Sequence, residues 1–206
     1  MVSAASNTEN FGRFAPLFIA QASNNDLVLP DNIGIHLNPQ QMVRLEEHFL
    51  NASTQPITGT GTVTLTTIPE DGKATASDMM FWGSTAIVIP RKSPGQAEMF
   101  KKVRAGVSIL GLTTHQHQFG TLATISQAQS AQGPATELYR NSNWAEPPLK
   151  RYDPPLTFDG STGLKLHCEY NNTSNNTVTF GESAATNEMC FFWAYYYPSH
   201  GFDVAF

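Results

Sequence analysis

The sequence is poor in charge, in cysteine and in long apolar runs. Charged residues make up 14% of the chain, against about 25% in typical soluble domains. The formal net charge is -5 and basic residues do not cluster, so we expect no nucleic-acid partner. No apolar run approaches the ~18 residues that a membrane-spanning helix needs, so we expect no membrane-spanning segment. The first six residues also lack the charged and apolar regions of a signal peptide.

Only two cysteines occur, Cys168 and Cys190. Strand alternation puts Cys168 on the same face as Leu166, and Cys190 on the same face as Phe192, so both sulfurs are expected to point into a core. We favour a disulfide between them, and therefore an oxidising compartment that is extracellular or periplasmic. A pair of buried thiols is the alternative.

Short β-type segments alternate with clusters of Asn, Pro and Gly, which predicts an all-β fold, an antiparallel jelly-roll-like β-sandwich. Three of the breakers are Pro69–Gly72, Ser93–Gly95 and Asp153–Pro155. The expected strands are Met42–Leu50, Thr60–Ile68, Thr85–Ile89, Arg104–Thr114, Gly120–Ser126, Leu164–Tyr170, Thr177–Phe180 and Met189–Tyr197. A shift in composition near residue 68 predicts two parts: an N-terminal portion, 1–68, and a complete sandwich, 69–206.

The strongest chemical signal is the pair His115 and His117, which follows a β-branched, apolar run. Residues two apart on a strand point to the same face, so both imidazoles would approach one ion. Two neutral imidazoles suit copper or zinc, and a thioether from Met189 would favour copper, whose reduced state is soft. The alternative is that the His pair arises by chance and that Met189 fills the core.

Several segments resemble the type II copper, ascorbate-dependent monooxygenases, the family of peptidylglycine α-hydroxylating monooxygenase and dopamine β-monooxygenase. The first, Thr114–Gly120, is similar to the family's His-Thr-His motif. The family's last stretch is similar to Cys168–Thr173, Gly181, Asn187–Cys190 and Tyr195–Tyr196. A third segment, Glu46–Asn51, resembles the strand that donates the last His of the family's other copper site.

The resemblance implies that His115, His117 and Met189 bind the copper that reacts with O2 and hydroxylates a substrate C–H bond, with ascorbate as reductant. It also implies the disulfide between Cys168 and Cys190. In the family two similar sandwiches each hold one copper, so residues 1–68 would be the end, or a remnant, of an N-terminal copper-monooxygenase-type domain.

The second copper site of the family does not match this chain. That site needs an adjacent His-His pair upstream of the strand carrying His48, and no such pair occurs. Either the chain begins after that motif or the second copper has been lost. His48 is therefore a weak candidate ligand, and otherwise a surface or supporting histidine.

Substrate-lining positions also diverge from the peptide-hydroxylating member of the family. The positions that would anchor a peptide carboxylate are occupied here by Thr113, Phe191 and Trp193. Alternation puts Met189, Phe191 and Trp193 on one face, which predicts an aromatic wall beside the copper and a small apolar or aromatic substrate. The alternative is that this stripe packs against a neighbouring sheet or a missing N-terminal copper domain.

His167 is a further weak candidate. If Cys168 and Cys190 bond across neighbouring strands, His167 and Met189 turn to the same opposite face, where His167 could support the site or act as a fourth ligand. It is otherwise an ordinary exposed histidine. The sequence thus favours a copper monooxygenase, over a non-catalytic copper-binding or interaction domain, and over a metal-independent sugar- or protein-binding sandwich.

Overall fold

The computed structural model describes residues 15–47, 54–69 and 72–206, and the regular structure in these ranges is entirely β. The largest sheet contains β1 (Ile33–Ile35), β2 (Thr75–Ser84), β11 (Cys190–Tyr197), β5 (Ser108–His115), β8 (Lys150–Thr157) and β12 (Asp203–Ala205). A second sheet contains β4 (Ser93–Lys102), β9 (Gly163–Asn172), β6 (Gly120–Ala128) and β7 (Ala135–Asn141). A short pair is formed by β3 (Val88–Ile89) and β10 (Val178–Thr179).

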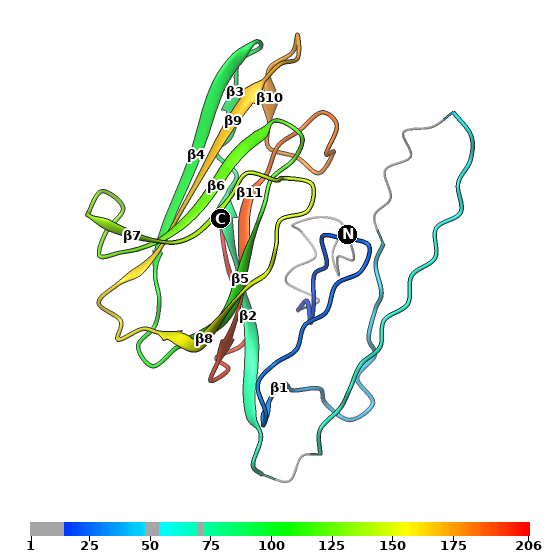
Figure 1. The fold of residues 1–206 in the computed structure, drawn as a ribbon, viewed down its shortest axis with the longest axis vertical. Coiled ribbons are helices and arrows are strands. Elements are labelled where there is room, and N and C mark those ends of the chain that lie inside the picture. The colour runs from blue at the N-terminus through cyan, green and yellow to red at the C-terminus, as the bar shows by residue number, and fades with distance from the viewer. Residues whose placement is uncertain (1–14, 48–53, 70–71) are drawn as a thin grey trace.

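The two larger sheets form the expected all-β, jelly-roll-like sandwich, which is confirmed (Figure 1). In the six-stranded sheet, β11 lies between β2 and β5 and is antiparallel to both. The other edge of β2 pairs in parallel with β1 and, further along, with β12. The part of the chain that the structure describes contains no helix that could cross a membrane.

The six-stranded sheet is buried on both faces. Its inner face packs on the second sheet in a core that includes Trp82, Leu112 and Phe192. Its outer face carries a second apolar cluster, which we call the outer cluster: Ile19, Met79, Phe81, Leu110, Phe191, Trp193 and Tyr195. Residues 15–35, the N-terminal segment, run beside the sandwich and contribute Ile19 to this cluster (Figure 1). Double-sided burial explains why β11 is almost wholly apolar.

Two expected strands are wrong. Neither residues 42–47 of the expected strand Met42–Leu50 nor residues 60–68 form a strand; residues 48–50 lie outside the described residues. These arms run on the far side of the N-terminal segment from the sheets (Figure 1), and they lie close together, because a Cβ at Gly61 would meet the Glu47 carboxylate. Of these residues only Glu47 takes part in a β-bridge, and a single bridge does not extend into a ladder, so neither arm forms a strand.

Two segments that read as breakers are instead strands. Ser93–Gly95 begins β4, and Asp153–Pro155 lies inside β8. Both strands are at the edge of their sheets. A proline, which has no backbone N–H, is tolerated there because the outer side of an edge strand has no partner strand to bond. Conversely, the expected strand at Arg104 begins only at Ser108, because Gly106 turns the chain with a φ of 83°.

Candidate metal centre

The two histidines lie together at the end of β5. His115 is the last residue of the strand, and His117 lies just beyond it in a turn that the Gly120 N–H closes by donating to the His117 carbonyl (3.0 Å). The ring centroids are 5.1 Å apart and the rings are nearly perpendicular, at 87°. Both side chains are buried, with exposed fractions of 6% and 3%. The structure therefore brings the predicted pair together, although only His115 belongs to the strand.

Each histidine uses its Nδ1 to donate a hydrogen bond to an oxygen. The His115 Nδ1 donates to Oε1 of Gln21 (2.8 Å), and the His117 Nδ1 donates to the Asn187 carbonyl (3.0 Å). In a neutral imidazole this leaves the lone pair on Nε2, the form in which histidine binds metals. Burial lowers the pKa of His117, and its hydrogen bond to Asn187 opposes that shift in part, so the ring is neutral at pH 7.

Met189 lies beside this pair. Phe191 pairs with His115 at the end of the β5–β11 ladder, and Met189 precedes Phe191 by two residues, just outside β11. One carboxylate oxygen, Oε2 of Glu188, accepts the backbone N–H of both His117 (2.9 Å) and Met189 (3.2 Å). The Met189 side chain packs against the outer cluster, whose Trp193 ring lies 6.2 Å from that of His115. The thioether and the imidazoles thus share one face of the sheet.

Glu188 is the buried anchor of this arrangement, and sequence reasoning missed it. Its side chain is fully buried, and its other oxygen, Oε1, accepts the Phe119 N–H (2.7 Å). Burial raises the pKa of this carboxyl, while the hydrogen bonds from the backbone N–H groups lower it. The signal in the sequence was alternation: Glu188 has the same parity as Cys190 and therefore faces the core, where a carboxylate needs several donors.

The three predicted substrate-lining residues lie beside the His pair but are covered. Phe191 is 1% exposed and Trp193 is 2% exposed, and both belong to the outer cluster. Thr113 is buried as well, with its hydroxyl donating to the Pro147 carbonyl (3.3 Å). The stripe shares this cluster with Ile19 of the N-terminal segment, and the Phe191 ring also lies against Phe180 and Phe206. Contact of these residues with a substrate stays a prediction.

The disulfide between Cys168 and Cys190 is present and confirms the favoured pairing. It joins β9 of one sheet to β11 of the other, with the two Cα atoms 5.9 Å apart. The arrangement considered for His167, with the two cysteines on neighbouring strands, is therefore wrong. Because the bond crosses the core, the residues next to each cysteine point out of opposite sides of the sandwich.

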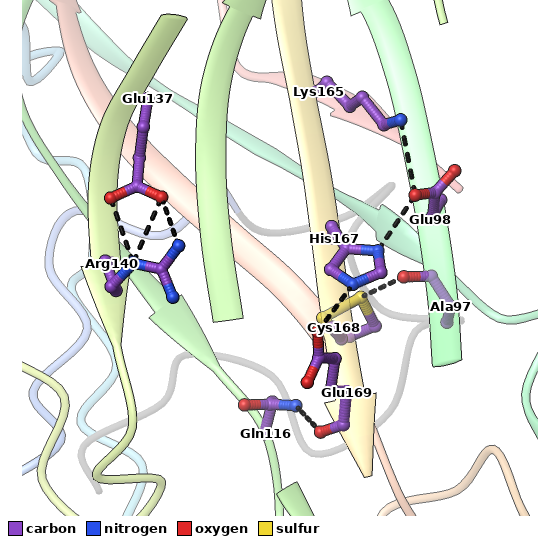
Figure 2. A network of polar contacts seen from close by, with 10 residues as sticks. Ala97, Glu98, Gln116, Glu137, Arg140, Lys165, His167, Cys168 and Glu169 are labelled. Carbon is purple, nitrogen blue, oxygen red and sulfur yellow. Dashed lines mark hydrogen bonds and ion pairs between the residues drawn. A yellow bond between two sulfur atoms is a disulfide. The ribbon is translucent and has the colours of Figure 1, made fainter. Parts of the chain in front are cut away.

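His167 consequently lies on the outer face of the four-stranded sheet. Figure 2 shows its ring between two carboxylates, with Nδ1 2.9 Å from Glu98 Oε1 and Nε2 3.3 Å from Glu169 Oε1. Lys165 also pairs with Glu98, at 3.3 Å (Figure 2). His167 therefore lies on β9, in the sheet that does not carry His115 and His117, and its ring is held by these contacts. The other weak candidate, His48, lies outside the described residues.

The candidate donor set consists of two imidazoles with ring centroids 5.1 Å apart and the thioether of Met189, whose backbone N–H shares the Glu188 carboxylate with that of His117. Among the described residues, no group of three or more His, Cys, Asp or Glu side chains could hold a metal ion. Met189 does not count toward such a group, because methionine is not one of those four residue types. Two imidazole nitrogens with a thioether suit a soft, redox-active ion better than a structural zinc, which takes four N or S ligands. The residues present therefore fit copper.

One comparison with known proteins gives a match. The sequence pattern of the family described as copper type II ascorbate-dependent monooxygenase, C-terminal domain, matches residues 92–206. The matched range begins at the start of the four-stranded sheet and includes both histidines, Met189 and the disulfide. No curated protein matches the chain.

Proposed function

The chain belongs to the copper type II, ascorbate-dependent monooxygenase family, and on that premise we propose that it is a copper-dependent monooxygenase. In this proposal one copper ion binds to His115, His117 and Met189. Bound copper supplies the one-electron redox chemistry by which O2 and a reductant such as ascorbate hydroxylate a C–H bond. The disulfide supports an extracellular or periplasmic location, because such bonds persist in oxidising compartments.

The arrangement of the two imidazoles is the observation that carries the proposal. Both rings are buried, both Nδ1 atoms donate to oxygens, and both Nε2 lone pairs belong to rings 5.1 Å apart. A histidine that binds a metal through one ring nitrogen commonly donates its other ring N–H to an oxygen, and both rings do so here. The hydrogen bonds of Glu188 to the backbones of His117 and Met189 support the third ligand.

The protein's contribution to the reaction is to hold this geometry in a dry surrounding. Burial keeps His117 neutral, and the outer cluster packs beside the His pair and excludes water. We propose a small apolar or aromatic substrate, because Phe191 and Trp193 occupy the positions next to the ligands. In the present packing the Phe191 ring lies against Phe180 and Phe206, with ring centroids 5.9 and 5.3 Å away.

We also propose that residues 1–68 derive from an N-terminal copper-monooxygenase-type domain and that 69–206 form the copper-binding sandwich, with β1 and Ile19 of the first part packed onto the second. The support for this division is the exposure of large apolar side chains before the boundary, which are of the kind that a sheet normally buries. They are Met42, Val43, Leu45, Ile57, Val63, Leu65 and Ile68.

Copper content and Cu(I) X-ray absorption test the ligand set. We expect about one copper per chain with a sulfur scatterer that disappears in Met189→Ala. Met42→Ala is the matched control, because the Met42 side chain is 93% exposed, and it should keep the sulfur signal. No copper above background, or a sulfur signal that survives in Met189→Ala, would contradict the proposed site.

Oxygen uptake driven by ascorbate then separates the enzyme from its main alternative. The wild-type chain should consume O2 in a copper-dependent manner, and His117→Ala should not. Bound copper without turnover would instead indicate a non-catalytic copper-binding or interaction domain. A chain that binds no copper would be a sandwich with a metal-independent role.

A further inference from the structure

Gln21 joins the N-terminal segment to the strand that carries His115. Its amide nitrogen donates to the Thr114 carbonyl (2.9 Å) and to the Thr113 hydroxyl (3.2 Å). Its amide oxygen accepts from Nδ1 of His115 at 2.8 Å. The Gln21 residue is only 8% exposed, so these hydrogen bonds are made out of water. All of the hydrogen-bonding groups of this side chain are therefore directed at three consecutive residues of β5.

The Thr114 carbonyl fixes which way the amide of Gln21 faces. A carbonyl oxygen only accepts hydrogen bonds, so the atom 2.9 Å from it must be the amide nitrogen. The amide oxygen is then the atom that faces His115, and it too only accepts. The proton between Gln21 and His115 must consequently lie on Nδ1 of the imidazole, which leaves the lone pair on Nε2.

We infer that Gln21 is a positioning residue of the metal centre, which selects the Nδ1-protonated tautomer of His115 and so presents Nε2 as the ligand atom. The inference rests on the proposed function for the identity of the ligand. For His117 the same task falls to a backbone carbonyl, that of Asn187, which no substitution removes. For His115 it falls to a side chain.

The location of Gln21 extends the metal centre beyond the matched family domain. That match begins at residue 92, whereas Gln21 lies in the N-terminal segment that covers the outer cluster. The neighbouring residue Ile19 donates its backbone N–H to the Tyr195 hydroxyl (3.4 Å), which holds the segment on β11. In this chain the copper-binding sandwich is completed by residues that precede it.

The experiment measures the tautomer of His115 by long-range 1H–15N NMR in the metal-free protein, and copper affinity in the loaded protein. Gln21→Leu removes the acceptor, and Gln21→Glu keeps an oxygen acceptor for Nδ1 while losing the amide donors. Gln127→Leu is the matched control, because the Gln127 side chain lies on the other sheet, where it donates to the Thr162 hydroxyl (2.8 Å).

We expect the Nδ1–H tautomer in the wild type, in Gln21→Glu and in Gln127→Leu. In Gln21→Leu we expect the Nε2–H tautomer to be populated and copper affinity to fall by about 10- to 100-fold. An unchanged tautomer in a folded Gln21→Leu would overturn the inference, whatever happens to copper affinity. A switched tautomer in Gln21→Glu would overturn it as well. If the wild type binds no copper, the proposed function fails, and the tautomer measurement still decides what Gln21 does.

Discussion

At the scale of single residues, the candidate site depends on buried polar side chains whose hydrogen-bonding atoms all have partners. The Glu188 carboxylate accepts hydrogen bonds from the backbone N–H groups of His117, Phe119 and Met189. Gln21 divides its amide between the β5 backbone and the His115 ring. Neither residue is a proposed ligand, yet each fixes the position of one. The positions of the proposed ligands are consequently set by hydrogen bonds as well as by strand geometry.

Replacing Glu188 should destabilise the fold. Glu188→Ala leaves three backbone donors unsatisfied, and each buried unsatisfied group costs about 1–3 kcal/mol, so we expect a loss of at least about 3 kcal/mol in the free energy of unfolding. Urea denaturation followed by circular dichroism measures it. Glu182→Ala, at an exposed position of the same loop, should change stability by less than about 0.5 kcal/mol. Equal stability of the two variants would show that the carboxylate of Glu188 does not hold the turn.

At the scale of elements, β11 connects the chemistry to the core. One face of this strand carries Phe191 and Trp193 in the outer cluster, and the other carries Phe192 in the inner core. Close packing continues to β2, where a Cβ on Gly83 would lie 2.0 Å from the Phe191 ring and 2.4 Å from the Cys190 carbonyl. The start of β11, next to Met189, is therefore held between its neighbours with little freedom.

Removing the disulfide should loosen that same end of β11. The sequence separation of 22 residues corresponds to about 3 kcal/mol of loop-closure entropy, so the double variant Cys168→Ala with Cys190→Ala should lose about that much stability. Copper affinity should fall with it, because Met189 precedes Cys190 directly. Denaturation of the oxidised and reduced wild type provides the matched comparison. A double variant as stable as the oxidised wild type would mean that packing alone joins the two sheets.

At the scale of the whole molecule, the sandwich and the N-terminal segment act as one packed unit around the site. The segment closes the outer face of the six-stranded sheet, so the His pair lies between a sheet and its cover. Arms 42–47 and 54–69 lie on the far side of the N-terminal segment from the two sheets (Figure 1). A ligand bound at the His pair would connect residues from β5 and from the start of β11, and would stabilise the whole fold.

Copper should therefore raise the melting temperature of the chain. A ligand that binds only the folded state at 100 times its Kd adds about 2.7 kcal/mol to the free energy of unfolding. Differential scanning calorimetry with and without copper measures the shift, and a chelator should reverse it. The doubly substituted chain His115→Ala with His117→Ala should show no shift. A similar increase in that variant would place the stabilising metal elsewhere.

The sequence by itself determined what depends on local alternation and on residue type. Alternation put Met189, Phe191 and Trp193 on one face of a strand and Cys190 on the other. The order of the His pair, the two cysteines and Met189 along the chain indicated the family. Tertiary structure alone decided which segments meet. It put Cys168 and Cys190 in different sheets, carried His167 to the far face, brought Gln21 to His115 and covered the aromatic stripe with the N-terminal segment. The physical reason is that the face of a strand is set by its own backbone, whereas its partners are selected by long-range packing.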